Sequence, residues 1–165
     1  MTLNNFLCYH NNTMRKNELL ESKIGPKLVT IGKLSRIYAL QTFAEHKYKI
    51  TPEQFTILAT LVENNGMYQR QIASITLKDR PNITRLLRIL EKSEFITKQP
   101  DINKRKIYKI FITDKGREIY NEVLPTVLNI WQESVKGLNE EELKICIKAL
   151  DIFRKNLEGK VNIQV

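Results

Sequence analysis

The amino-acid sequence predicts a mainly α-helical fold with one small β-hairpin. Apolar side chains recur at helical spacing along most of the chain, and polar start signals, two of them close to a proline, mark where helices begin. After Phe95 the period changes to that of short strands. Four helices are therefore expected before the hairpin and two after it. With 165 residues and 42% hydrophobic content, the chain suits one domain, or a small domain with extra helices.

The N-terminal part is expected to contain a loose extension and one long helix. Residues 1–20 are polar, rich in asparagine and only weakly periodic. From about Ile24 to His46, apolar residues return near one side of an amphipathic helix, at Leu28, Ile31, Leu34, Ile37 or Tyr38, and Phe43.

The next helix has a sharper start signal. In "TPEQFTILATLVENNG", Thr51 caps the helix, Pro52 suits its first position, and Gln54 completes a capping box. Its buried face is expected to hold Phe55, Leu58, Leu61 and Val62. A short helix follows in "YQRQIASIT", anchored by Ile72, Ala73 and Ile75.

Residues 78–95, "KDRPNITRLLRILEKSEF", predict a helix with two different faces. A narrow apolar stripe consists of Ile83, Leu86, Leu87 and Leu90. The opposite side carries Pro81, Arg85, Arg88 and Lys92. A solvated surface is one explanation for these cations. An exposed face normally mixes charges of both signs, however, and this one carries no acid.

The spacing between these last two helices predicts a helix-turn-helix unit. Such a unit needs a small residue where its helices touch, with apolar residues ten and thirteen positions later, and Ala73, Ile83 and Leu86 satisfy this spacing. Leu77 stands where glycine often makes the turn. The unit places the N-terminal residues of its second helix in the major groove of DNA, which here are Arg80, Pro81, Asn82, Thr84 and Arg85.

The segments "ITKQP" and "IYKIFIT" predict the two strands of the hairpin, joined by the polar turn "DINKRK". The hairpin sets five cations against Asp101 alone: Lys98, Lys104, Arg105, Lys106 and Lys109. A basic hairpin tip fits the narrow minor groove of DNA, although a solubilising loop can have the same composition. The helix–helix–helix–hairpin order is that of a winged helix-turn-helix.

Two more helices are expected after the hairpin. Thr113 caps the first, in which Pro125 is expected to cause a kink or a break. Asn139 starts the second, whose apolar stripe consists of Leu143, Cys146, Ile147, Leu150, Phe153 and Leu157. The stripes of the outer helices exceed what a winged domain needs for its own core. A symmetry mate is the simplest partner to bury them.

The positive charge is concentrated in the middle of the chain. The formal net charge is +9, and residues 66–116 hold 12 Lys and Arg against 5 Asp and Glu, a net +7. A basic block in an otherwise balanced chain indicates a polyanionic partner at that block. RNA is a weaker candidate than duplex DNA because no aromatic stacking platform accompanies the block.

Several other classes are disfavoured. The chain has only two histidines, no nucleophile elbow, no glycine-rich phosphate loop and no paired metal ligands, so neither an enzyme nor a metal or cofactor site is expected. Cys8 and Cys146 match no metal or redox spacing, and Cys146 is expected to be buried and inert. No apolar run is long enough to span a membrane, so a cytoplasmic protein is expected.

The stretches "ITPEQFTILATL", "QIASITLKDRPNITRLLRILEKSEFI" and "NKRKIYKIFITDKG" resemble, in this order and spacing, the signature stretches of the MarR (multiple antibiotic resistance regulator) family. The resemblance covers roughly residues 24–157 and is most specific from Asp79 to Gly116. It implies dimerisation helices over 21–48 and 117–160 around a DNA-binding lobe over 51–116.

The resemblance also implies a homodimeric repressor on an inverted-repeat operator, released by a small phenolic or other aromatic ligand or by cysteine oxidation. By position, Asn82, Thr84, Arg85 and Arg88 match residues that meet bases and phosphates, and Arg105 matches the wing-tip arginine. Asn103 replaces a more usual aspartate. The residues suggested to line a ligand pocket are Tyr38, Phe43, His46, Phe55 and Tyr68, although plain core residues, or a surface cap in the case of His46, are the simpler explanation for each. The alternative function is a winged-helix module for protein interaction or DNA architecture without a ligand.

Overall fold

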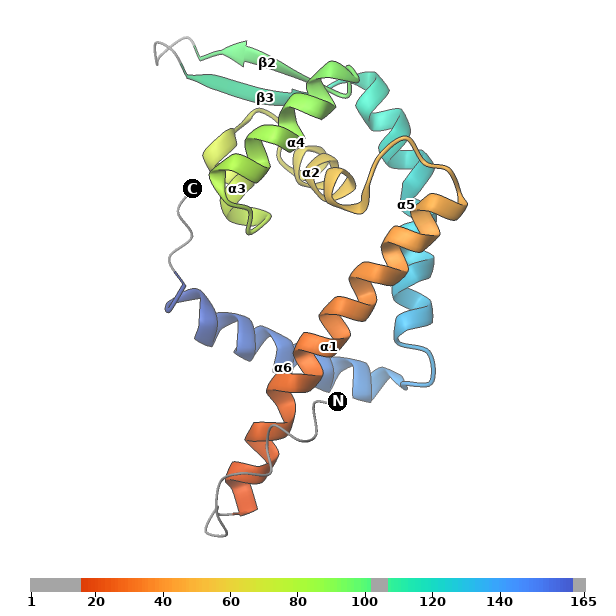
Figure 1. The fold of residues 1–165 in the computed structure, drawn as a ribbon, viewed down its shortest axis with the longest axis vertical. Helices are drawn as coiled ribbons and strands as arrows, with labels where there is room; N and C mark the ends of the chain where they lie inside the picture. The colour runs from red at the N-terminus through yellow and green to blue at the C-terminus, as the bar shows by residue number, and fades with distance from the viewer. Residues whose placement is uncertain (1–15, 102–106, 162–165) are drawn as a thin grey trace. The chain divides into compact units, whose positions relative to one another are not determined.

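The computed structural model describes residues 16–101 and 107–161; the remaining residues are drawn in grey in Figure 1. The described chain falls into two units, the first ending at Tyr38 and the second beginning at Ala39. No helix among the described residues is long and apolar enough to cross a membrane.

The first unit consists of helix α1 (Lys16–Glu45) as far as Tyr38. The helix begins inside the stretch for which a loose extension is expected, and residues 1–15 lie outside the described residues. The sequence pattern did not predict this early start, because "KNELLESK" consists largely of strong helix formers but has no apolar residues at helical spacing. The apolar residues predicted along the part of this helix in the first unit, including Ile31 and Leu34, are exposed in the single chain, whereas Phe43 near its end is buried.

The second unit contains the winged helix-turn-helix, and the predicted order of helices and hairpin is confirmed (Figure 1). After the end of α1 its elements are α2 (Pro52–Glu63), β1 (Met67–Tyr68), α3 (Gln69–Ile75), α4 (Arg80–Lys92), β2 (Ile96–Pro100), β3 (Tyr108–Ile112), α5 (Asp114–Ser134) and α6 (Glu140–Glu158).

The wing is a three-stranded antiparallel sheet in the order β1-β3-β2. The hairpin pairs Ile96 with Ile112 and Pro100 with Tyr108, which confirms the two predicted strands. The short strand β1 pairs Met67 with Ile110 and was not predicted, because two residues are too few to show a strand period. Strand β1 leads directly into α3, so the sheet is hydrogen-bonded to the start of the helix-turn-helix.

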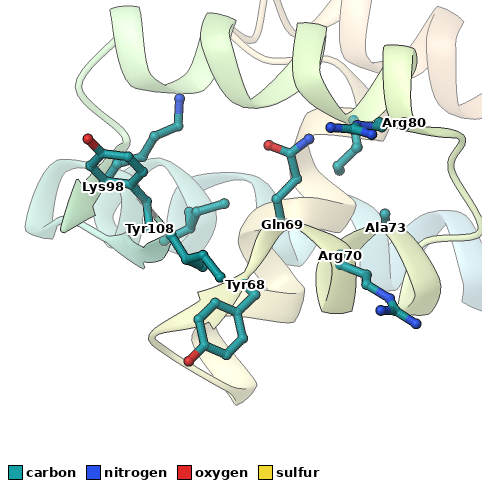
Figure 2. A pocket seen from close by; sticks show the side chains of 10 residues that line it. Tyr68, Gln69, Arg70, Ala73, Arg80, Lys98 and Tyr108 are labelled. Carbon is teal, nitrogen blue, oxygen red and sulfur yellow. The ribbon is translucent and has the colours of Figure 1, made fainter. Parts of the chain in front are cut away.

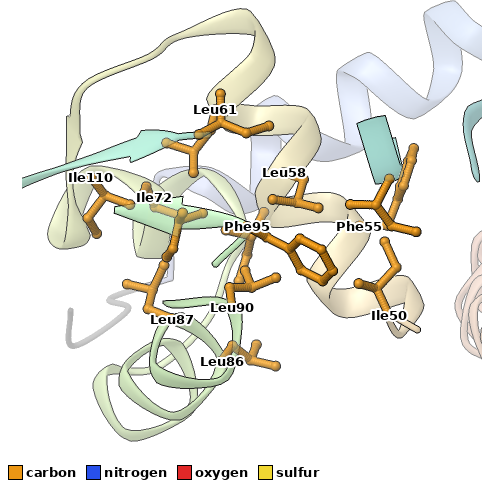
Figure 3. Close-up of a cluster of buried hydrophobic side chains, with 14 of the residues drawn as sticks. Ile50, Phe55, Leu58, Leu61, Ile72, Leu86, Leu87, Leu90, Phe95 and Ile110 are labelled. Carbon is orange, nitrogen blue, oxygen red and sulfur yellow. The ribbon is translucent and has the colours of Figure 1, made fainter. Parts of the chain in front are cut away.

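One hydrophobic core joins α2, α3, α4 and the sheet (Figure 3). The predicted stripe of α4 is confirmed, since Ile83, Leu86, Leu87 and Leu90 are all at most 2% exposed. Helix α2 is buried more widely than its predicted face, because Ile57 is fully buried and the polar residues Gln54 and Thr60 are also buried. This central position makes α2 the helix against which the DNA-binding elements pack.

The predicted helix caps are present. Thr51 and Gln54 form the reciprocal capping box of α2, with the Thr51 N–H donating to Gln54 Oε1 at 2.8 Å. Asn139 and Glu142 form another at the start of α6. Helix α5 runs without interruption through Pro125, so the proline does not divide it.

The junction between the wing and α5 depends on a threonine and a glycine. The Thr113 hydroxyl accepts a hydrogen bond from the Gly116 N–H at 3.0 Å and donates one to the Glu94 carbonyl at 2.6 Å. The Thr113 N–H donates to the Phe95 carbonyl at 3.1 Å. A Cβ at Gly116 would lie 2.1 Å from that carbonyl oxygen, so only glycine fits.

We expect Gly116→Ala to destabilise the fold by roughly 2–3 kcal/mol, because backbone atoms rather than a flexible side chain must give way. The measurement is the free energy of unfolding by urea titration. Gly159→Ala is the matched control, since Gly159 has an ordinary φ of −73° and no atom within 4 Å of its added Cβ. Equal stability of the two variants would contradict this account of the junction.

Candidate nucleic-acid interface

Helix α4 begins with a side-chain cap that also orients one of its exposed residues. Asp79 accepts a hydrogen bond from the Asn82 backbone N–H at 2.8 Å through one carboxylate oxygen. Its other oxygen accepts from Asn82 Nδ2 at 2.9 Å. Pro81 occupies the first turn, where no backbone donor is needed. The Asn82 side chain is thus held in place, with its Oδ1 and one N–H still available for a base edge.

The side of α4 opposite the apolar stripe is cationic and exposed. Arg80, Arg85, Arg88 and Lys92 all lie on the surface, and none of them makes an ion pair with another described residue. A shallow hollow of about 400 Å³ on this face is lined by Arg80, Pro81, Thr84, Arg85 and Arg88. Because no carboxylate in the described part of the chain pairs with these guanidinium groups, the face attracts a polyanion.

The turn between α3 and α4 has the predicted helix-turn-helix geometry. Ala73 is 1% exposed at the helix contact, and its carbonyl accepts a hydrogen bond from the Lys78 N–H at 3.0 Å. Leu77 adopts a φ of +51°, the left-handed conformation for which glycine is the more usual residue. Lys78 Nζ forms an ion pair with Glu53 Oε1 at 3.0 Å, which ties the turn to α2.

Thr84 is half-buried, and its hydroxyl is engaged on both sides. It accepts a hydrogen bond from Gln69 Nε2 at 2.8 Å and donates its proton to the Arg80 carbonyl at 2.7 Å. The hydroxyl proton is therefore committed within the protein, and Thr84 can offer a base its methyl group or the remaining acceptor lone pair of its oxygen, but no donor.

The wing cations differ in their surroundings. Lys98 on β2 forms an ion pair with Glu91 of α4 at 2.5 Å. The pair neutralises part of the charge of Lys98 and holds the wing against α4. Lys109 Nζ lies 5.6 Å from the centre of the Tyr68 ring. The predicted wing-tip residues Lys104, Arg105 and Lys106, with Asn103, lie outside the described residues.

A phenol–carboxylate contact joins the start of the helix-turn-helix to the end of β2. The Tyr68 hydroxyl donates a hydrogen bond to Asp101 Oδ2. This hydrogen bond to Asp101 raises the pKa of Tyr68 above its ordinary value, and burial and the negative charge of Asp101 act in the same direction. The Asp101 N–H donates to the Ile107 carbonyl at 2.8 Å and extends the hairpin pairing beyond Pro100.

The residues suggested for a ligand pocket are not all brought together. Phe43 and Phe55 are buried in the core with their ring centroids 6.3 Å apart. His46 is exposed, stacks on Tyr48, and is hydrogen-bonded through Nδ1 to the Thr42 carbonyl at 2.9 Å. Tyr68 lies instead on β1 beside the wing, and Tyr38 belongs to the first unit.

A groove beside α4 contains residues that sequence reasoning did not select. It has a volume of about 580 Å³ and lies between the start of α3, the first turn of α4 and the wing strands (Figure 2). Its polar lining includes Gln69, Arg70 and Tyr108, together with Arg80 and Lys98. Helix α3 is too short for its polar side to stand out as a pattern, so the tertiary structure was needed to find these residues.

Cys146 corrects one expectation. It is a free, exposed cysteine rather than a buried one, because α6 contains no buried residue in the single chain. No group of three or more His, Cys, Asp or Glu side chains in the described part of the chain could hold a metal ion.

Known transcriptional regulators resemble this chain in sequence and in fold. The model of the MarR family matches residues 50–108. YybA, an HTH-type transcriptional regulator of Bacillus subtilis, is 30% identical over 131 residues, which cover 78% of this chain and 86% of YybA. A crystal structure of the transcriptional regulator SlyA is 29% identical with a TM-score of 0.73, covering 83% of this chain and 95% of SlyA.

Bordetella bronchiseptica BpsR, whose structure concerns regulation of its DNA binding by 6-hydroxynicotinic acid, shares the fold with a TM-score of 0.73 at 20% identity. The match covers 80% of this chain and 98% of BpsR. The residues matched by the family model, 50–108, include α3, α4 and β2. With its winged helix-turn-helix, its cationic α4 and these relatives, the chain belongs to the MarR family of DNA-binding transcriptional regulators.

Proposed function

We propose that the chain is a homodimeric repressor that reads an inverted-repeat operator with α4 and is released by a small aromatic ligand. The observation that carries the DNA-reading part is the exposed face of α4, where Arg85 and Arg88 have no acidic partner among the described residues. A helix of this kind enters the major groove with its N-terminal residues leading. The capped start of α4 supplies Asn82 and Arg85 at that end.

The α4 side chains divide into two roles by their chemistry. An arginine can donate two hydrogen bonds to one guanine, which is worth about 1–3 kcal/mol of discrimination against the wrong base. Arg85 and Arg88 are assigned this role, while Arg80 and Lys92 at the two ends of the helix are assigned to phosphates, as are Lys104 and Lys106 of the wing. Arg105 at the wing tip is assigned to the minor groove.

The dimer is supported by the uncovered apolar stripes of the outer helices. On α6, Ile147, Leu150 and Leu157 are 60%, 47% and 57% exposed, although they lie on one side of the helix. Helix α1 exposes a similar series that includes Ile31 and Leu34. Exposed apolar stripes of this length are unfavourable for a monomer in water. Association with a second copy of the chain would bury the stripes of both α1 and α6.

The ligand is supported by two observations. One is a cluster of aromatic side chains where the end of α1 meets α2 and α5, between which an aromatic ligand would insert its ring; Phe55 stacks on Tyr120 with ring centroids 5.2 Å apart, and the Tyr48 hydroxyl is hydrogen-bonded to Thr126 Oγ1 at 2.6 Å. BpsR, a protein of the same fold, is regulated by an aromatic acid. A ligand that separates or rotates the two lobes changes the spacing between the two α4 helices, which weakens DNA binding.

Selection of bound sequences from random duplex DNA tests the function directly. The expected result is an inverted repeat whose half-sites are about one helical turn apart, because each lobe of the dimer reads one half. The selection is repeated with salicylate and with 6-hydroxynicotinate, and one of them is expected to reduce the recovery of that sequence. Recovery of no preferred sequence would support the alternative, a winged-helix module that binds a protein partner or DNA without sequence preference.

Arg85→Ala and Arg88→Ala are each expected to reduce affinity for the selected duplex by about 5-fold to 100-fold and to relax the preference at particular base pairs. Arg105→Ala is expected to lose affinity, most of all for duplexes with A·T-rich flanks, because arginine favours the narrow minor groove there. Quantitative gel shifts against single-base variants of the duplex measure both effects. Parent-like binding by all three variants would refute the assignment.

Leu150→Glu is expected to convert the dimer to a monomer and to abolish binding to the full inverted repeat, because it places a charge in the apolar stripe of α6. Sedimentation equilibrium measures the mass. Lys148→Glu is the control, since it adds a carboxylate on the polar side of the same helix. If Leu150→Glu kept the dimeric mass, α6 would not lie in the interface.

A further inference from the structure

We propose that the groove between α3, α4 and the wing binds a phosphate group of the DNA backbone, and that Gln69 couples this contact to the position of α4 (Figure 2). The inference rests on the proposed function and adds two residues from outside the recognition helix, Arg70 and Gln69. It also gives the helix-turn-helix a means of coupling the backbone contact to base reading.

The charge and polarity of the groove suit an anion that is bound by direct hydrogen bonds. Arg70 and Arg80 are exposed, and neither forms an ion pair with another described residue. Gln69 and the Tyr108 hydroxyl add uncharged donors, and no acidic side chain lies among the described residues that line the groove. Arginine, glutamine and tyrosine are all side chains that commonly contact phosphate oxygens.

The position of the groove matches the course of a DNA strand. In a helix-turn-helix the second helix enters the major groove while the first crosses the backbone, and α3 is the first helix here. Arg80 lines both this groove and the cationic hollow on α4. A strand that α4 contacts through Arg80 therefore passes the mouth of the groove.

Gln69 joins the two helices through a chain of hydrogen bonds. Its Nε2 donates to Thr84 Oγ1 at 2.8 Å, and that hydroxyl donates to the Arg80 carbonyl at 2.7 Å. The amide has a second N–H, which is available to a phosphate oxygen. Figure 2 shows the Gln69 side chain pointing toward α4, with Arg80 at one end of the groove and Lys98 and Tyr108 at the other. A bound phosphate would thus hold Gln69 and, through Thr84, the first turn of α4.

The salt dependence of binding tests the phosphate contact. If each lobe meets about four to five phosphates, a plot of log affinity against log salt for the parent dimer should have a slope of about −7 to −9. Since each lobe loses one phosphate contact, Arg70→Gln is expected to make that slope shallower by about 1 to 2 and to reduce affinity about 10-fold or more, without changing the selected sequence.

Lys136→Gln is the charge-matched control and is expected to leave the slope unchanged. It removes one positive charge from the turn after α5, which lies roughly 30 Å along that helix from the wing. A slope for Arg70→Gln that equals the parent slope would overturn the phosphate site. If the parent protein bound no duplex at all, the proposed function itself would fail, which is a different result.

A double-mutant cycle tests the coupling through Gln69. Gln69→Met keeps the length of the side chain without its amide, and Thr84→Val keeps the shape without the hydroxyl. Each is expected to weaken binding about 3-fold to 10-fold, and the double variant is expected to be no weaker than the worse single variant. The thermal unfolding midpoints of all three should match that of the parent, which excludes a loss of fold.

Lys92→Gln combined with Thr84→Val provides the comparison, because Lys92 lies about two turns further along α4, at the opposite end from the groove. Their effects on affinity are expected to multiply. If the losses of affinity caused by Gln69→Met and Thr84→Val also multiplied in the double variant, Gln69 would not act through Thr84. That result would overturn the role of Gln69 in coupling.

Discussion

The burial of one apolar stripe on α4 determines the orientation on which the DNA-binding surface depends. Ile83, Leu86, Leu87 and Leu90 are enclosed by α2, α3 and the sheet, and each contributes roughly 1.5–3 kcal/mol by leaving water. Rotation of the helix about its axis would expose these side chains and bury arginines. The same packing that stabilises the lobe therefore holds Arg85 and Arg88 on the surface.

The wing is joined to this framework at three places. The Lys98–Glu91 ion pair connects β2 to α4, and the Tyr68–Asp101 hydrogen bond connects the end of β2 to the start of α3. The Thr113 hydroxyl, at the junction of β3 and α5, donates to the Glu94 carbonyl between α4 and β2. The first two contacts are partly exposed, and such contacts are individually weak. Together they restrict how the strands can move relative to α4, so the two parts that meet DNA are positioned by one body.

The outer helices differ from the DNA-binding lobe in where their apolar residues can be buried. In the second unit, α2 and α4 bury most of their apolar residues within the chain, whereas α6 buries none. The expectation that Cys146 would be buried failed for this reason, since it treated the apolar stripe as part of the core of a single chain. Helix formation is a local property, but the partner that covers a stripe is not.

The sequence by itself determined the order of the helices, the hairpin, the caps at Thr51 and Thr113, and the two faces of α4, because each follows from local spacing and start signals. It did not reveal β1, which has no period of its own, or the ten-residue groove with Gln69, Arg70 and Tyr108. Those residues come together only when α3 packs on α4 and the strands pair. The commitment of the Thr84 hydroxyl to Gln69 and Arg80 also required the tertiary structure, since the amide that binds it lies 15 residues away in the chain.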